Sequence, residues 1–208
     1  MDRARIASML GGPLTLRVGE GRIVRVRAVQ AGDAAAIQHF VRALSDTARR
    51  RRFFAPIREL TPAMLKRLTE VDGWRDRVLV ALAEDDSGER VVALAQYAAD
   101  KDKRCELALV VADGWQNLGL GRLLVDLLIE TARAAGFVRA EGDVLRGNEA
   151  MLGLARAFGF AVTRSPHDAT LLRITRDLGE EPQRADRPAF ALATRPAIAP
   201  RMPAAYRV

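Results

Sequence analysis

The amino-acid sequence predicts a mixed α/β fold, in which an antiparallel meander of strands feeds a β-α-β crossover. Three observations lead to this fold class. Three strand-like apolar runs follow one another between residues 77 and 111, and the first two flank an Asp-Asp-Ser-Gly turn at 85–88. A turn with two glycines at 116–121 then opens a long amphipathic helix. Beyond that helix, strand-like and helical segments alternate as far as residue 175.

Before the meander, the sequence predicts one strand and two helices. Residues 1–20 show no sustained periodicity and are expected to form a flexible lead. Residues 23–29 alternate apolar and basic side chains, which is typical of a half-buried strand. Asp33, a favoured N-cap residue, precedes the helix at 34–44. The helix at 61–70 opens with Thr-Pro, where the missing N–H of proline costs nothing.

The later elements are bounded by caps and glycines. The strand-like runs are 77–83, 91–97, 105–111, 139–144 and 170–175. Leucines at 120, 124, 127 and 128 share one face of the helix that follows the glycine turn, and Gly136 ends this helix. Asn148 is a candidate cap for a short helix up to Phe158, after which Gly159 and Phe160 lead into another strand.

Composition narrows the class of protein. The 208 residues suffice for one domain with a substantial core, which we place at 21–178. Residues 179–208 are rich in proline and arginine and are expected to form a disordered basic tail. No apolar run is long enough to span a membrane, and the N-terminus does not resemble a signal peptide. Cys105 is the one cysteine, which excludes an intramolecular disulfide. From the apolar runs, the N-terminus and the cysteine count together, we expect a cytoplasmic protein with no membrane partner.

The net charge of +7 is carried mostly by arginine and suggests an anionic ligand or partner. A phosphorylated cofactor and nucleic acid both satisfy this charge, and so does a general use of arginine throughout the chain. The two histidines are scattered, so no metal site is expected. The run from Arg49 to Arg52 has two interpretations: a docking surface for an acidic protein face, or a solvated helix end.

The turn between the third strand and the long helix has the features of an anion site. It reads Gln116-x-x-Gly119-x-Gly121-Arg122. Glycines leave backbone N–H groups free to point outward, and the start of a helix adds partial positive charge, so the turn can bind a phosphate or pyrophosphate. It is not a Walker A loop, because no Gly-Lys-Ser/Thr follows. It is not a dinucleotide fingerprint either, because Leu124 stands in place of the third glycine.

Two motifs resemble those of the GNAT (Gcn5-related) N-acetyltransferases. They are Val111-x4-Gln116-x-x-Gly119-x-Gly121 and Asn148-x-x-Met151-x-x-Leu154, followed by Gly159-Phe160. A closer resemblance, over about residues 22–178, is to the acetyltransferase domain of bacterial Pat-type protein lysine acetyltransferases. The segments that carry it are Leu44-Ser45, Arg52-Phe53-Phe54, 60–69, 106–111 and 148–160.

The resemblance implies the GNAT fold, with a splayed central pair of strands and with acetyl-CoA as the cosubstrate. It also implies that the pyrophosphate lies on backbone N–H groups of the glycine turn and that the pantetheine arm pairs with the open strand edge. The cofactor-binding residues implied in this way are Leu109, Val110, Val111, Gln116, Asn117, Leu118, Gly119, Leu120, Gly121, Arg122 and Asn148.

The resemblance further implies direct attack of an amine on the thioester in a ternary complex. It places the general base at Glu106 and gives the N–H of Leu109 the role of oxyanion donor. The alternative interpretation of Glu106 is a surface glutamate at a strand end. Many family members carry a tyrosine that protonates the leaving thiolate, and this chain has Ala155 there, as Pat-type sequences tend to.

The implied acceptor is a protein lysine side chain. The expected partners are therefore acetyl-CoA and a protein with an accessible lysine, and the chain is expected to act as a monomer or homodimer. A small-molecule amine, such as a polyamine, an amino acid or an antibiotic, is the second interpretation. A non-catalytic module that senses CoA or binds nucleic acid is the third, although nucleic acid is not an expected partner.

Overall fold

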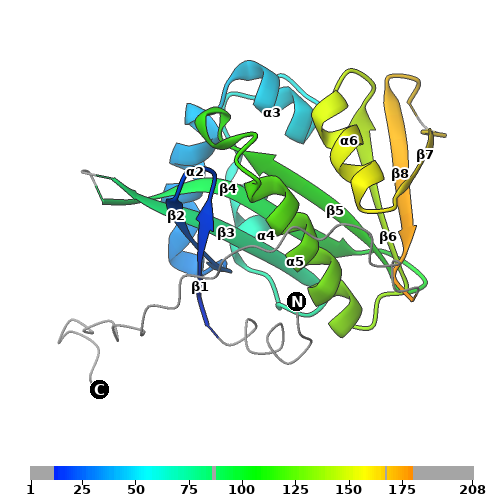
Figure 1. Ribbon diagram of the computed structural model, residues 1–208, viewed down its shortest axis with the longest axis horizontal. Helices are drawn as coiled ribbons and strands as arrows, with labels where there is room; N and C mark the ends of the chain where they lie inside the picture. The colour runs from blue at the N-terminus through cyan, green and yellow to red at the C-terminus, as the bar shows by residue number, and fades with distance from the viewer. Residues whose placement is uncertain (1–11, 86–87, 167, 180–208) are drawn as a thin grey trace.

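The computed structural model describes residues 12–85, 88–166 and 168–179. Its centre is an eight-stranded sheet with helices on both faces (Figure 1). In spatial order the strands are β1 (Leu14–Val18), β2 (Arg22–Ala28), β3 (Asp76–Asp85), β4 (Gly88–Ala99), β5 (Arg104–Val111), β6 (Arg139–Leu145), β8 (Leu171–Asp177) and β7 (Ala161–Arg164). The β5–β6 pair is parallel, and all the others are antiparallel.

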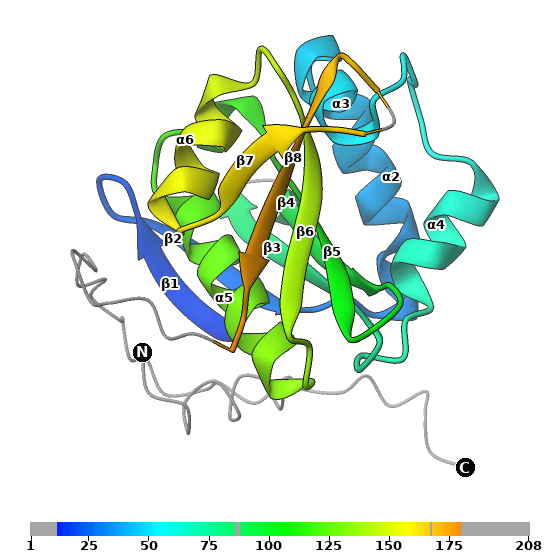
Figure 2. The same ribbon diagram turned by 90° about the vertical axis from the view of Figure 1, so that its right-hand side faces the viewer.

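The helices form one layer on each side of the sheet, as Figure 2 shows. One layer contains α2 (Ala34–Ala43), α3 (Asp46–Phe53) and α4 (Pro62–Thr69), and the other contains α5 (Leu120–Ala134) and α6 (Glu149–Ala157). Two short 3-10 turns are η1 (Ala31–Asp33) and η2 (Asp113–Trp115). None of the described helices combines the length and the apolar composition that crossing a membrane requires.

Two apolar cores fill the space between the sheet and the two helical layers. Alternate residues of β3 belong to different cores: Leu79 and Ala81 pack with α5, whereas Val78 and Val80 pack with α2. This alternation follows from the pleat, which sends successive side chains to opposite faces. Because both faces are covered, the central strands are apolar along nearly their whole length.

Strands β5 and β6 separate soon after they begin. Their parallel pairing ends at Glu106 and Glu141, although β5 stays paired with β4 as far as Val111. Gly142 lies at the point of divergence, where a Cβ atom would come within 3.1 Å of the Leu107 carbonyl oxygen. The expectation of a splayed central pair of strands is confirmed, as is the mixed α/β class with its meander and crossover.

Strand β1 corrects the expectation for the N-terminal segment. Within residues 1–20, which we expected to form a flexible lead, Leu14–Val18 pairs with β2 and buries Leu16 and Val18 in the core beside α5. Residues 1–11 lie outside the described part of the chain. The same holds for residues 180–208 of the expected tail.

Helix α3 is an element that the sequence pattern did not separate from its surroundings. Its N-cap is Ser45, whose Oγ accepts a hydrogen bond from the Ala48 N–H at 3.1 Å. Four consecutive arginines hide any apolar periodicity, and Ala48 is the buried residue of this helix. Tertiary contacts therefore determine which of the arginines face solvent.

Candidate active site

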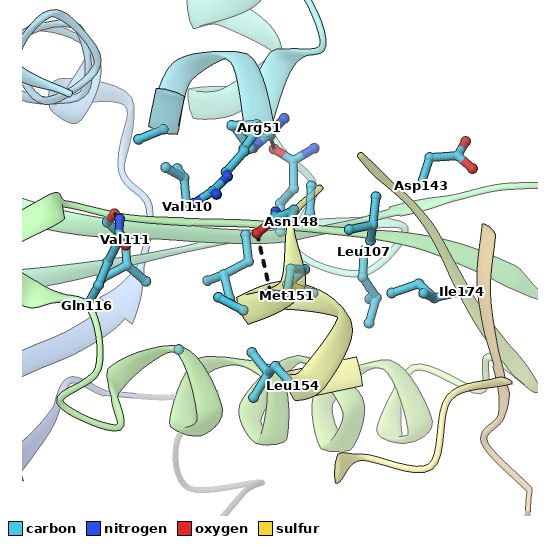
Figure 3. A pocket seen from close by; sticks show the side chains of 18 of the residues that line it. Arg51, Leu107, Val110, Val111, Gln116, Asp143, Asn148, Met151, Leu154 and Ile174 are labelled. Atoms are coloured by element: carbon cyan, nitrogen blue, oxygen red, sulfur yellow. Dashed lines mark hydrogen bonds between the residues drawn. The ribbon is translucent and has the colours of Figure 1, made fainter. Parts of the chain in front are cut away.

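A cavity of about 390 Å³ opens where β5 and β6 diverge. It passes from one face of the sheet to the other, because side chains from both helical layers line it (Figure 3). The lining residues that the chemistry below uses are Arg51, Arg52, Gln96, Glu106, Leu109, Gly119, Asp143 and Asn148. The divergence of the two strands thus gives a ligand access to an otherwise hydrogen-bonded sheet.

The open edge of β5 presents the backbone groups of alternate residues to this cavity. The Ala112 N–H donates to the Val92 carbonyl at 2.9 Å, so Ala112 turns its backbone groups toward β4. The preceding residue turns the opposite way: the Val111 carbonyl accepts from Gln116 Nε2 at 3.1 Å instead. By the same alternation the N–H and C=O of Leu109 face the cavity, at a level where β6 no longer pairs with β5.

The glycine turn between η2 and α5 has a backbone that favours glycine. Asn117 and Gly119 have φ values of 60° and 84°, in the left-handed region, and Gly119 is the N-cap residue of α5. The N–H groups of residues 117–121 make no hydrogen bond within the described residues. They are therefore available to an anion at the positive end of the α5 dipole.

The run of available N–H groups starts one residue later than we expected. The Gln116 N–H donates to the Asp113 carbonyl at 3.3 Å, and the Gln116 side chain holds the end of β5. Gln116 thus orders the turn through both its backbone and its side chain. The Leu118 carbonyl is held in addition, by the Gly19 N–H of the β1–β2 turn at 3.0 Å.

Glu106 is an exposed carboxylate on the wall of the cavity, and it is the last residue of β5 that pairs with β6. Its register partner on β6 is Glu141, which pairs with Arg104 at 3.4 Å and with Arg173 at 3.1 Å. Within the described residues Glu106 itself has no ion pair. Its carboxylate therefore remains available to accept a proton or bind a cation.

Asn148 lies at the opposite side of the cavity and caps α6. Its Oδ1 accepts a hydrogen bond from the Met151 N–H at 3.4 Å (Figure 3). The helix uses the side-chain oxygen, so the amide nitrogen is the group that Asn148 can offer to a ligand. Leu154 lies six residues further along the chain, on α6, and lines the same cavity.

The four arginines of α3 have different roles, so neither of our two interpretations describes the whole run. Arg49 donates to the carbonyls of the last turn of α2 and pairs with Asp46. Arg50 is exposed. Arg51 and Arg52 line the cavity, and Arg52 Nη2 donates to Gln96 Oε1 at 2.8 Å.

Besides the expected site residues, Arg52, Gln96 and Asp143 line the same cavity as Glu106. Gln96 had a visible signal, since it is the polar residue in the apolar run 91–97. Asp143 had none, because a charged residue in a strand is usually on a solvated face. Arg52 was singled out only as part of the run from Arg49 to Arg52. Among the described residues, no group of three or more His, Cys, Asp or Glu could hold a metal ion.

Comparison with known proteins agrees with this geometry. The model of the acetyltransferase (GNAT) family matches residues 41–160. The chain belongs to this family. It is 36% identical over 152 residues to an acetyltransferase of Pseudomonas aeruginosa, covering 73% of this chain and 82% of that protein. It is 32% identical over 152 residues to acetyltransferase Pat of Mycolicibacterium smegmatis, covering 72% of this chain but 44% of Pat.

Solved structures show the same fold. The GNAT domain of S. lividans PAT superposes with a TM-score of 0.71 at 25% identity, covering 79% of this chain and 96% of that domain. The putative acetyltransferase yncA of Salmonella typhimurium, solved with acetyl-CoA, has a TM-score of 0.60 at 21% identity, covering 78% and 98%. GNAT enzymes transfer an acetyl group from acetyl-CoA, so this member is an acetyl-CoA-dependent acyltransferase. The open strand edge and the N–H groups of residues 117–121 suit such a cosubstrate.

Proposed function

We propose that this acyltransferase acetylates a primary amine by direct attack on acetyl-CoA, with Glu106 as the general base. The observation that carries the proposal is the divergence of β5 and β6. It opens one cavity that contains the Glu106 carboxylate, the open edge at Leu109 and the glycine turn. These are the three groups that the reaction needs: a proton acceptor, an oxyanion donor and an anion site.

In the proposed complex the pyrophosphate of acetyl-CoA lies on the N–H groups of residues 117–121. Arg122, whose guanidinium lies 5.3 Å from the centre of the Phe158 ring, adds positive charge beside them. The pantetheine arm follows the β5 edge from Val111 to Leu109. Asn148 contributes its amide nitrogen from the α6 side.

The reaction begins with an amine that is mostly protonated. At pH 7 one lysine amine in about 2,500 is neutral, because its ordinary pKa is near 10.4. Glu106 accepts the proton, and the amine nitrogen bonds to the thioester carbon. The Leu109 N–H donates to the oxygen that gains negative charge. The C–S bond then breaks, and the CoA thiolate leaves.

The leaving thiolate receives no proton from the position where many family members carry tyrosine. Ala155 occupies that position; it is buried and lines a small apolar pocket that shares Met151 and Leu154 with the cavity. A free thiol has an ordinary pKa near 8.5, so a thiolate is an acceptable leaving group near neutral pH. In this mechanism the thiolate takes its proton from water after the C–S bond breaks.

A protein lysine is the acceptor that we propose. Its support is the resemblance of residues 22–178 to Pat-type enzymes, together with the relatives named Pat. Incubation of the purified chain and labelled acetyl-CoA with candidate proteins, and separately with small amines, tests this class by mass spectrometry. Transfer confined to the small amines would assign the chain to the second class of acceptor.

The variant Glu106→Gln tests the proposed base. It should keep CoA affinity within about twofold and lower kcat at pH 7 by about 100- to 10,000-fold. Glu70→Gln is the matched control, because Glu70 is an exposed residue that pairs with Lys66 at 3.5 Å, outside the cavity. An unchanged kcat in Glu106→Gln would contradict the proposed role of this carboxylate.

A further inference from the structure

The cavity wall around Glu106 carries more positive charge than transfer to a simple amine requires. Arg51 and Arg52 line this wall from α3. The other carboxylate in the described lining is Asp143, which Arg173 holds by two parallel hydrogen bonds of 2.8 Å. The charge of Asp143 is therefore already compensated. Glu106 is the negative charge that remains opposite two guanidinium groups.

Arg52 has neutral partners. Its Nη2 donates to Gln96 Oε1 at 2.8 Å, and its guanidinium carbon lies 4.9 Å from the centre of the Phe53 ring. No carboxylate of the described chain lies within 4.0 Å of the charged nitrogens of Arg51 or Arg52. Most of the five N–H donors of Arg52 are therefore left for another acceptor.

The environment of Arg52 disfavours its charge in the absence of such an acceptor. Burial lowers the pKa of the guanidinium to about 10, and attraction to the more distant Glu106 offsets this effect only in part. Buried charges in proteins are normally paired, since an unpaired one keeps the full cost of desolvation.

Elsewhere in this chain, partly buried arginines bind carboxylates with two parallel hydrogen bonds. Arg27 binds Asp33 in this way at 2.7 and 2.8 Å. Arg173 binds Asp143 likewise. The planar guanidinium matches the two oxygens of a carboxylate, and this pairing is among the strongest that an arginine makes. Arg52 has the burial of these residues without the carboxylate.

We propose that Arg52, positioned by Gln96 and assisted by Arg51, binds a carboxylate of the acceptor, whose amine faces Glu106. The inference rests on the proposed function of the cavity and adds the class of acceptor: an amine with a carboxylate close beside it. Two sources offer this chemistry, a free amino acid and a lysine with an acidic neighbour in a peptide. Polyamines lack the carboxylate and meet two positive charges.

Matched acceptors test the proposal with the full chain and acetyl-CoA. One pair is L-lysine and 1,5-diaminopentane, which differ in the carboxylate. The other pair is acetyl-Asp-Lys-Ala-amide and acetyl-Ala-Lys-Ala-amide. We expect kcat/KM to be at least about tenfold higher for the carboxylate-bearing member of one pair, and that pair identifies the source. The proposal is overturned if neither pair shows a preference for its carboxylate-bearing member.

Three variants assign the preference to Arg52. In Arg52→Gln the ratio of kcat/KM for the carboxylate-bearing acceptor to kcat/KM for its carboxylate-free partner should fall toward one. Arg52→Lys should restore part of the ratio, since it keeps the charge but not the planar fork. Arg50→Gln, at an exposed position of the same helix, should keep the wild-type ratio. If Arg52→Gln lowers both kcat/KM values equally, Arg52 positions Glu106 and does not bind the acceptor.

Binding of reaction products gives a readout that does not depend on turnover. Calorimetry compares the two acetylated products of whichever pair shows the preference, Nε-acetyl-lysine against N-acetyl-1,5-diaminopentane or the two acetylated peptides, on the wild-type chain saturated with CoA. The carboxylate-bearing product should bind at least about tenfold more tightly, and Arg52→Gln should abolish the difference. Equal affinities would overturn the carboxylate site even in an active enzyme. Full activity of Glu106→Gln would instead contradict the proposed base and leave this binding result standing.

Discussion

The Ser45 hydroxyl donates a hydrogen bond of 2.7 Å to Asp113 Oδ1, and the Ser45 N–H donates one of 3.1 Å to Asp113 Oδ2. Ser45 is the N-cap of α3, and Asp113 opens η2, the turn that leads into the glycine turn. One carboxylate therefore connects the helix that carries Arg51 and Arg52 to the loop that we propose binds pyrophosphate. This contact fixes the position of α3 relative to the glycine turn, at the two ends of the cavity.

Ser45→Ala should affect both stability and cofactor use. Loss of the N-cap lowers the free energy of unfolding by about 1 kcal/mol, and loss of the hydroxyl contact with Asp113 should raise the KM for acetyl-CoA several-fold. Thr61→Ala is the matched control: Thr61 caps α4 by accepting from the Met64 N–H at 3.2 Å and does not touch the loop. Urea unfolding and initial rates distinguish the two variants. Equal KM values in both would show that Ser45 acts only as a cap.

Asp113→Asn should change how stability depends on pH. Burial raises the pKa of the Asp113 carboxyl, but hydrogen bonds from Ser45 outweigh burial and leave the pKa lowered. Because the folded pKa lies below the unfolded one, the ionised carboxylate stabilises the fold above the unfolded pKa of about 3.9. This contribution is lost as the pH falls through the folded pKa. Since Asp113 is exposed, the contribution of its ionised carboxylate to the free energy of unfolding should not exceed about 1 kcal/mol.

Urea unfolding at pH 7, 5 and 3 checks this expectation. Wild type should be more stable than Asp113→Asn at pH 7 and pH 5, and the difference should shrink at pH 3. Asp102→Asn, at an exposed position of the β4–β5 turn, should keep the wild-type pH dependence. If the difference in the free energy of unfolding between wild type and Asp113→Asn stays constant down to pH 3, the contact stabilises the fold through packing and not through the charge of Asp113.

Gly119→Ala should weaken cofactor binding for a local backbone reason. A Cβ atom at the left-handed φ of 84° costs about 1 kcal/mol or more, and relief of this strain would turn N–H groups away from the anion. Gly136→Ala is the matched control, because Gly136 has a φ of 83° after α5 and no atom within 4 Å of an added Cβ. Both variants should lose similar stability by urea unfolding. Only Gly119→Ala should lose CoA affinity, by about tenfold, in calorimetry.

Many elements of this fold could be predicted from the sequence, because their signals are local. The apolar runs 91–97 and 105–111 predict strands, and leucines three and four residues apart predict α5. Cys105 belongs to the second of these runs, and it is fully buried. Burial raises the pKa of its thiol to about 12. Strand β1 escaped prediction because its short apolar stretch becomes meaningful only when paired with β2.

What the sequence by itself determined is the backbone character of the glycine turn, since left-handed φ and helix starts are properties of a few consecutive residues. The proposal of Glu106 as the base rests instead on the resemblance to Pat-type enzymes and on its place at the head of an apolar strand. The tertiary structure decided where β5 and β6 part, that Arg52 meets Gln96 across 44 positions of sequence, and that Asp143 is neutralised by Arg173. Such pairings depend on register and burial summed over the whole sheet, and no local pattern records them.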